Sequence, residues 1–355
     1  MNLPKLKIGN LEAKFPIIQG GMGIGISMSK LASAVANEGG IGIISGAQTG
    51  YRENDFKTNN NNANINGIKK EIRLAKELSP NGIIGINFLQ ASYNYIELVK
   101  TAVEEKIDLI ISGAGLPKTL PEYVKGTNTK IAPIVSSGRA AKLLAKLWKK
   151  KYDYLPDLIV VEGPRAGGHL GFSREDLESN NVKNLKELVV EVLEAIKPFE
   201  EKYNQKIPVV AAGGIYTGQE IKEFIDLGAA GVQMATRFVA TNECDAHINF
   251  KTAYINATEK DIQLIKSPVG LPGRVITNTL TKQIEANSLK IKGCYKCLKG
   301  CNPVVAPFCI TEALIKAVKG DIVNGLIFIG SNGYKINKII SVKELFNELK
   351  NEYFE

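Results

Sequence analysis

Short apolar runs alternate with helix-like segments along most of this chain, and this alternation restricts the folds that are open to it. Eight runs of five or six mainly apolar residues have the length and composition of strands. We predict strands at 15–19, 41–45, 82–87, 108–112, 130–135, 157–162, 207–211 and 231–235. The predicted helices cover 29–38, 67–78, 93–105, 121–125, 139–150, 185–203 and 218–227. Strands that are apolar on both faces are typical of parallel sheets covered by helices.

The order of these segments predicts an α/β protein built as a closed (β/α)8 barrel of the TIM type, because strands that alternate with helices form repeated parallel βαβ units. An open doubly wound sheet is the alternative, and its dinucleotide fingerprint G-x-G-x-x-G would follow the first strand. Residues 20–27 read GGMGIGIS, and no placement of the fingerprint fits them. The barrel is therefore favoured.

The chain is longer than such a barrel needs. A (β/α)8 barrel takes about 250 residues, whereas this sequence has 355. Most of the surplus lies at 241–307, ahead of helices predicted at 310–319 and 342–352. Because no linker is evident, we expect one domain over 1–355, in which 241–307 forms a lid on the face that carries the site. The polar stretch 59–62 is expected to be a solvated loop.

Composition and charge exclude several classes of protein. The chain is 44% hydrophobic and 23% charged, which excludes disordered and fibrous proteins. The formal net charge is +9, but the basic residues are scattered among acidic ones, which is typical of a solvated surface and not of a nucleic-acid site. Neither a signal peptide nor an apolar run of about 18 residues is present. We therefore expect a cytoplasmic protein without nucleic-acid or membrane partners.

Glycine-rich segments follow several predicted strands, where the active sites of barrels collect. They occupy 19–23 after the first strand, 112–115 after the fourth and 213–214 after the seventh. Barrels commonly hold phosphate at the loops after strands seven and eight, on free backbone amides at the start of a helix such as the one predicted from 217–218. We therefore predict a phosphorylated cofactor, with its phosphate on Gly213, Gly214, Ala235 and Thr236.

One of the two histidines lies at a position that suggests a functional role. His169 lies between glycines in the segment EGPRAGGHLG at 162–171, directly after the sixth predicted strand. An ordinary imidazole titrates near neutrality, so His169 suits proton transfer or contact with an anion. The alternative is a turn histidine exposed to solvent.

Six short blocks run in order through the chain. They are PIIQGGM at 16–22, GGIG at 39–42, SGAG at 112–115, EGPRAGGH at 162–169, AAGGI at 211–215 and QMATRF at 233–238. Together they resemble the nitronate monooxygenase (2-nitropropane dioxygenase) family, which also contains the FMN-dependent enoyl-ACP reductases of type II. The AGGH ending is the most specific block, and the resemblance weakens beyond residue 240.

The resemblance implies a barrel that binds FMN without covalent attachment. The family's flavin contacts match Gly21, Met22, Gly23, Asn87, Glu162, Gly213, Gly214, Gln233, Ala235 and Thr236. Its functional histidine matches His169. Ala235 stands where the family usually has glycine, which places one methyl group near the expected phosphate.

The resemblance also implies an FMN-dependent oxidoreductase. A nitronate monooxygenase would oxidise alkyl nitronates with O2 to a carbonyl compound and nitrite. His169 would then hold the anionic nitro group or take the α-proton of a neutral nitroalkane. The alternative is an NAD(P)H-dependent enoyl-ACP reductase of fatty-acid synthesis, acting on an enoyl thioester, and the basic surface would suit an acidic carrier. A non-catalytic flavin-binding or redox-sensor protein is the second alternative. The oxygenase is favoured because it is the broader interpretation of the family, and the oligomeric state stays open, with a homodimer as one option.

A cysteine run near the C-terminus is not explained by the resemblance. Cys294, Cys297, Cys301 and Cys309 form the pattern C-x2-C-x3-C-x7-C. Three of these thiolates could converge on an iron–sulfur centre, whereas the second C-x2-C pair of a zinc site is missing. Reduced thiols in a loop are a second interpretation, and an accidental redox pair is a third. Arg274, at the end of GLPGR, is expected either to contact an anion from the lid or to be a plain surface arginine.

Overall fold

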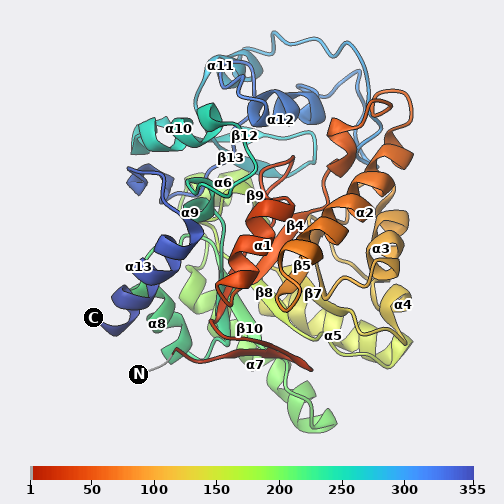
Figure 1. The fold of residues 1–355 in the computed structure, drawn as a ribbon, viewed down its shortest axis with the longest axis vertical. Helices are drawn as coiled ribbons and strands as arrows, with labels where there is room; N and C mark the ends of the chain where they lie inside the picture. Colours follow the sequence, from red (N-terminus) through yellow and green to blue (C-terminus); the bar gives the residue numbers. More distant parts are fainter. Residues whose placement is uncertain (1–2) are drawn as a thin grey trace.

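Eight parallel strands close into a barrel in the computed structural model, which describes residues 3–355 (Figure 1). The strands follow one another around the barrel in chain order, and β11 pairs with β3 to close it. They are β3 (Ile17–Gln19), β4 (Ile41–Ser45), β5 (Ile83–Leu89), β6 (Leu109–Gly113), β7 (Lys130–Val135), β8 (Ile159–Glu162), β10 (Val209–Ala212) and β11 (Gly231–Met234). The predicted (β/α)8 architecture is confirmed.

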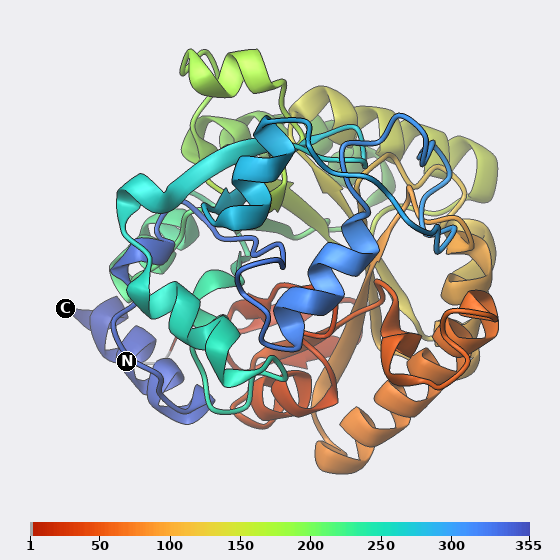
Figure 2. The same cartoon turned by 90° about the horizontal axis from the view of Figure 1, so that it is seen from above.

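A ring of helices covers the barrel, as the view along its axis shows (Figure 2). The ring consists of α1 (Ser29–Asn37), α2 (Asn60–Leu78), α3 (Tyr95–Glu104), α4 (Pro121–Val124), α5 (Gly138–Tyr152), α7 (Leu185–Tyr203) and α8 (Gly218–Asp226). The short α6 (Arg174–Glu178) and α9 (Thr236–Val239) follow β9 and β11. Among residues 3–355, no helix is long and apolar enough to cross a membrane.

The polar stretch 59–62 is not a loop, because Asn59 is the N-cap residue of α2 and residues 60–62 form its first turn, so that expectation was wrong. Asn60 is the first residue of the helix, and its side-chain amide donates to Oε1 of Gln48 at 2.8 Å. Buried Asn64, one turn later, donates to Oδ1 of Asn60 at 3.0 Å and accepts from the backbone of Gly50. These contacts fix the start of α2 against η1 (Thr49–Arg52), which local polarity alone does not reveal.

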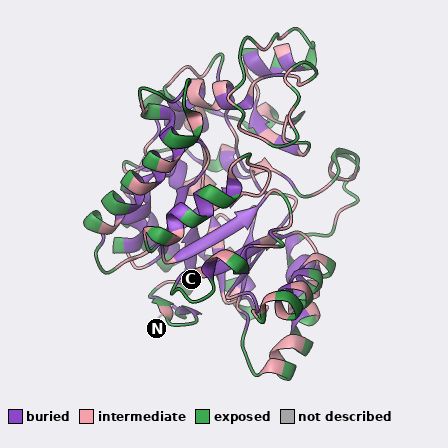
Figure 3. Ribbon diagram, turned by 90° about the vertical axis from the view of Figure 1, so that its right-hand side faces the viewer, coloured by how far each residue is buried: buried purple, intermediate pink, exposed green. Residues whose placement is uncertain are grey.

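An antiparallel hairpin closes the end of the barrel opposite the site. It consists of β1 (Leu6–Ile8) and β2 (Leu11–Ala13) and was not predicted, because three-residue strands carry too little pattern. Leu6 and Ile8 are fully buried and pack with side chains inside the barrel, including Ile18. The barrel strands are mostly buried, while the outer helices expose one face to solvent (Figure 3).

The segment after β11 is folded and crosses the carboxyl end of the barrel (Figures 1 and 2). It contains α10 (Ile248–Asn256), η2 (Glu259–Asp261), β12 (Ile262–Lys266), β13 (Pro272–Ile276) and α11 (Thr279–Glu285). It continues through α12 (Ile310–Val318) and η3 (Gly333–Lys335) to the C-terminal helix α13 (Val342–Phe354). Strands β12 and β13 form a three-stranded antiparallel sheet with β9 (Gly168–His169). The loop after β8 is thereby joined to residues about 100 positions later.

Candidate active site

One large cavity opens at the carboxyl ends of the barrel strands. It encloses about 1730 Å³ of empty space, part of which is open to solvent. The volume that the centre of a water-sized molecule can reach is about 270 Å³, which is close to the lower end of the about 300–1,000 Å³ that is typical of ligand pockets. Its wall includes the predicted functional histidine, His169, and every predicted flavin contact: Gly21, Met22, Gly23, Asn87, Glu162, Gly213, Gly214, Gln233, Ala235 and Thr236.

The glycines after β3 keep one wall of the cavity open. A Cβ atom at Gly21 would lie 2.5 Å from Cβ of Asn87, and one at Gly23 would lie 2.5 Å from Oγ of Ser45. Both positions therefore exclude any larger residue. Ser27 closes the turn that follows, since its Oγ accepts from the backbone N–H of Met22 at 2.8 Å. The main chain is thus held against the cavity without intervening side chains.

A second glycine pair shapes the end of the cavity at β10, which lies two strands from β3 around the barrel. Gly213 and Gly214 have φ angles of 99° and 90°, which a residue with a side chain rarely adopts. A Cβ at Gly214 would also lie 2.8 Å from Cβ of Arg165. Buried Asn332 donates to the carbonyl of Gly214 at 2.5 Å and accepts from Arg165 at 3.0 Å. At this end, the backbone of the two glycines forms part of the cavity wall, and the side chain of Arg165 lies beside it.

The start of α8 does not supply the free amides that were expected for phosphate. The backbone N–H of Thr217 donates to Glu220 within a capping box, and that of Gly218 donates to Glu352 of α13 at 2.7 Å. These donors are already satisfied by carboxylates. An anion at this end would have to use the backbone around Gly213, Gly214, Ala235 and Thr236 instead.

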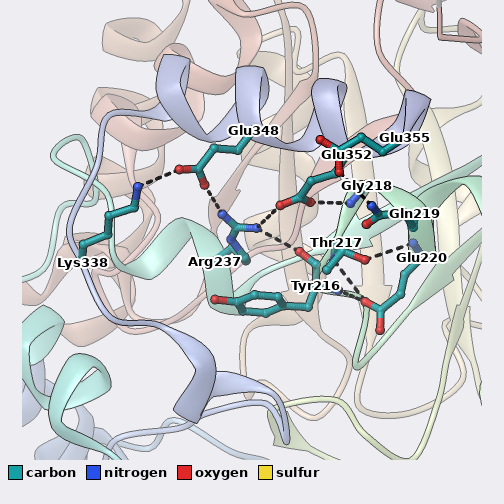
Figure 4. A network of polar contacts seen from close by, with 10 residues as sticks. All are labelled: Tyr216, Thr217, Gly218, Gln219, Glu220, Arg237, Lys338, Glu348, Glu352 and Glu355. Atoms are coloured by element: carbon teal, nitrogen blue, oxygen red, sulfur yellow. Dashed lines mark hydrogen bonds and ion pairs between the residues drawn. The ribbon is translucent and has the colours of Figure 1, made fainter.

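The C-terminal helix anchors this end of the cavity from outside (Figure 4). Arg237, which directly follows Thr236, has a side chain that is only 10% exposed and pairs with Glu348 of α13 at 2.5 Å. The same guanidinium donates to the carbonyl of Tyr216 at 3.1 Å and lies 4.7 Å from the centre of the Tyr216 ring. Arg237 therefore joins the loops after β10 and β11 to α13.

The cavity wall contains one buried polar atom without a protein partner and one desolvated carboxyl group. Within residues 3–355, Oε1 of Gln233 is buried and accepts no hydrogen bond. Glu162, at the end of β8, lies in a desolvated part of the wall that raises the pKa of its carboxyl to about 7. Buried polar groups without partners are uncommon, and a ligand donor is one explanation.

His169 lies in strand β9, not in an exposed turn. Its Nε2 lies 2.8 Å from Oγ of Ser267, and its ring packs edge-on against Phe328 with centroids 4.9 Å apart. Burial lowers the pKa of its imidazole to about 4. The expected titration near neutrality is therefore wrong, and His169 is neutral at pH 7, because charging a desolvated ring is costly.

Several cavity residues come from the segment after β11 and were not predicted. They are Tyr254, Val269, Cys297, Leu298, Ile310, Thr311, Leu314, Phe328, Ile329, Gly330 and Asn332. The covering segments thus extend past 307, where the predicted lid ends. Ser267 was also missed, although the SPVGLPGR run that contains it marks a tight turn in sequence.

Arg274 fits neither of its two expected roles. It lies in β13, opposite Gly168, and its guanidinium donates to the carbonyl of Ala166. It is half-buried, and burial together with the charge of Arg165 lowers its pKa to about 10. Arg274 is absent from the described wall of the cavity. Its contacts join the segment after β11 (235–355), named the excursion, to the loop that carries His169.

All five cysteines are free thiols. In the described part of the chain, no three His, Cys, Asp or Glu side chains come close enough together to hold a metal ion. Cys297 lines the cavity, Cys294 is exposed, and Cys301 and Cys309 are partly buried. Burial raises the pKa of Cys309 to about 11, which keeps it protonated at neutral pH. The geometry favours the interpretation as reduced thiols in a loop.

Comparisons with known proteins agree with this architecture. The family profile described as nitronate monooxygenase matches residues 5–352. A "(3aS,4S,5R,7aS)-5-hydroxy-7a-methyl-1-oxo-octahydro-1H-indene-4-carboxyl-CoA dehydrogenase" of Rhodococcus jostii (strain RHA1) is 26% identical over 270 residues. That match covers 76% of this chain and 65% of the relative, so it spans slightly less than two thirds of the relative's length. A probable nitronate monooxygenase of Staphylococcus aureus (strain JH9) is 27% identical over 77% of this chain and 78% of its own.

Solved structures resemble the whole chain. FabK from Thermotoga maritima superposes with a TM-score of 0.75 and 26% identity, covering 96% of this chain and 93% of its own. The nitroalkane oxidase from Streptomyces ansochromogenes gives a TM-score of 0.72 over 96% of this chain and 95% of its own. At 21% identity, that second likeness concerns the fold alone.

Proposed function

Since this chain belongs to the nitronate monooxygenase family and is an oxidoreductase enzyme, we propose that it binds FMN and oxidises alkyl nitronates with O2 to a carbonyl compound and nitrite. The observation that supports this most is the assembly of one cavity from His169, the two glycine pairs and the unpartnered Gln233. These residues lie far apart in the sequence and meet only at the carboxyl end of the barrel.

The cavity fits FMN on its own chemistry. The unpartnered Oε1 of Gln233 can accept from a ring N–H, and Gly21 and Gly23 leave space in which a flat ring can approach the main chain. Glu162 can accept hydrogen bonds from hydroxyl groups of a sugar-like chain. Gly213, Gly214, Ala235 and Thr236 would contact the phosphate. When bound, FMN would supply the electron transfer between substrate and dioxygen.

The chain's own residues would bind and orient the substrate. Neutral His169 stands on the wall of the cavity and can hydrogen-bond to a nitro group without adding a charge. Val269, Leu298, Leu314 and Phe328 place apolar surface on the side formed by the excursion. This surface would exclude water from the reacting atoms, which strengthens the polar contacts made there. We propose that the excursion, including 241–307, acts as a lid in this sense.

The second candidate is an NAD(P)H-dependent enoyl thioester reductase. Two observations favour it: the apolar part of the wall, which suits an acyl chain, and the 26% identity to FabK over nearly the whole chain. The same cavity residues would serve both reactions. The two candidates differ in what delivers electrons to the flavin.

The test follows the flavin spectrum under anaerobic conditions. The purified protein, loaded with FMN, is mixed separately with propyl-2-nitronate, NADH and NADPH. The proposal expects bleaching by the nitronate alone and release of nitrite once O2 is admitted. Bleaching by a nicotinamide, followed by reoxidation with crotonyl thioester, would support the reductase. A protein that binds no FMN, or that responds to none of the three, would contradict both.

A further inference from the structure

His169 and Ser267 form a hydrogen bond that joins two elements about 100 residues apart. His169 lies in β9, and Ser267 directly follows β12 in the turn toward β13. Ser267 is 2% exposed, and its Oγ lies 2.8 Å from Nε2 of the imidazole. The turn is closed by its own backbone, since Gly270 donates to the carbonyl of Ser267 at 3.0 Å. The backbone of this turn therefore fixes the position of the Ser267 hydroxyl.

The direction of this bond follows from the other partner of the hydroxyl. Oγ of Ser267 accepts the backbone N–H of Val269 at 3.3 Å. Within residues 3–355, Nε2 of His169 is the one remaining partner of this oxygen. A serine hydroxyl has a single proton to donate. If Nε2 carried a proton as well, the buried hydroxyl would keep a donor without an acceptor, which costs about 1–3 kcal/mol.

We infer that Ser267 donates to Nε2 and thereby fixes His169 as the tautomer that carries its proton on Nδ1. The protonation of one ring nitrogen is set by the hydrogen bond that the other makes. In the described chain, Nδ1 of His169 has no protein partner, and His169 lines the cavity. Nδ1 is thus the nitrogen left for a ligand, and it offers an N–H donor.

This tautomer selects the class of substrate, a consequence that rests on the proposed function. An N–H donor stabilises an oxygen that is anionic or becomes so, such as a nitronate oxygen. It has no lone pair with which to remove the α-proton of a neutral nitroalkane. Ser267 is therefore a positioning residue, and the enzyme should turn over nitronates while leaving neutral nitroalkanes untouched.

The tautomer can be measured without reference to catalysis, because the chain has two histidines. The imidazole nitrogens of 15N-histidine-labelled FMN-loaded protein are observed at pH 8 by long-range 1H–15N correlation. His247 is an internal control of the opposite kind, since its Nδ1 accepts from the backbone of Asn249 at 3.1 Å and so its proton lies on Nε2. His247→Asn, which keeps a helix-capping side chain, assigns the two signals.

The expected spectrum shows a protonated Nδ1 on His169 and a protonated Nε2 on His247. Ser267→Ala should shift His169 toward the Nε2–H form and lower kcat/KM for the nitronate about 2- to 10-fold, as loss of one hydrogen bond predicts. Ser267→Thr should restore both, and unchanged His247 signals report that the fold is intact. A proton on Nε2 of wild-type His169, or no shift in Ser267→Ala, overturns the inference whatever the enzyme turns over. If Nδ1 is protonated but the protein does not react with nitronate, the inferred tautomer is confirmed and the proposed function is rejected.

Discussion

His169 of β9 lies directly opposite Gly273 of β13 in an antiparallel pair. His169, which is expected to contact the substrate, is thus positioned by strand β13 of the excursion and not by the barrel alone. A Cβ at Gly273 would lie 3.0 Å from Cε1 of Phe328, the ring that packs on His169. The close approach of these two strands therefore sets where the imidazole stands.

His169→Ala should lower kcat/KM for a nitronate about 10²–10³-fold, the usual effect of removing one donor to a developing oxyanion. Steady-state nitrite release measures this, and the bound FMN content should not change. Because burial lowers the pKa of His169 to about 4, the wild-type rate should show no titration of this group between pH 6 and 8. A rate that falls with a pKa near 6.5 and becomes flat in the variant would contradict this assignment.

Gly214→Ala should weaken FMN binding at least about tenfold, which corresponds to about 1.4 kcal/mol. The new Cβ would lie 2.8 Å from Cβ of Arg165 and would disturb the phosphate end of the cavity. Gly126→Ala is a matched control, because Gly126 has a similar φ of 84° but no atom within 4 Å of the place that a Cβ would occupy. Fluorescence titration of the apoprotein with FMN gives both affinities. Equal losses in the two variants would show that backbone strain alone is responsible.

Gln233→Leu should weaken FMN binding without destabilising the apoprotein. The substitution removes a buried oxygen that has no protein partner, so the free energy of unfolding should stay the same or rise. Gln263→Leu is the control, since Gln263 also carries a buried side-chain atom without a partner but lies in β12, away from the cavity wall. Urea unfolding and FMN titration are measured for both. Unchanged FMN affinity in Gln233→Leu would remove Gln233 from the cofactor site.

Glu162→Gln should stabilise the apoprotein at pH 8 more than at pH 5. Burial raises the pKa of Glu162 to about 7, whereas an unfolded glutamate titrates near 4.5. The folded state therefore binds the proton more tightly, and wild-type stability falls as the pH rises from about 4.5 to 7. The amide carries no charge and abolishes this loss, which is on the order of 1–3 kcal/mol. Urea unfolding at the two pH values checks it, and a pH-independent difference would disprove the shift.

Arg237→Ala should destabilise the protein by about 2–4 kcal/mol, because it leaves Glu348 and the carbonyl of Tyr216 without their shared partner. FMN affinity should also fall, since the loops after β10 and β11 lose their link to α13. Lys338→Ala is the control, because it removes an exposed partner of the same Glu348 carboxylate and should change stability little. Thermal unfolding and FMN titration distinguish the two variants. Similar behaviour of both would refute the anchoring role.

The barrel and the rim of its cavity follow from the amino-acid sequence alone. Apolar runs of fixed length, separated by helical periodicity, specify parallel βαβ units, and such units place the loops after each strand on one face. Gly21, Asn87, Glu162 and Gln233 lie at or near the carboxyl ends of predicted strands, and the family resemblance implies that all four contact the cofactor.

The contacts that cover the rim of the cavity depend on the tertiary structure. His169 and Ser267 are 98 residues apart, and Arg237 and Glu348 are 111 apart. Local patterns carry no information about such pairs, because strand pairing and ion pairing across the fold depend on where whole elements pack. The same reason explains the unexpected start of α2 and the low pKa of His169. A neutral imidazole results from burial, and burial is a property of the folded chain.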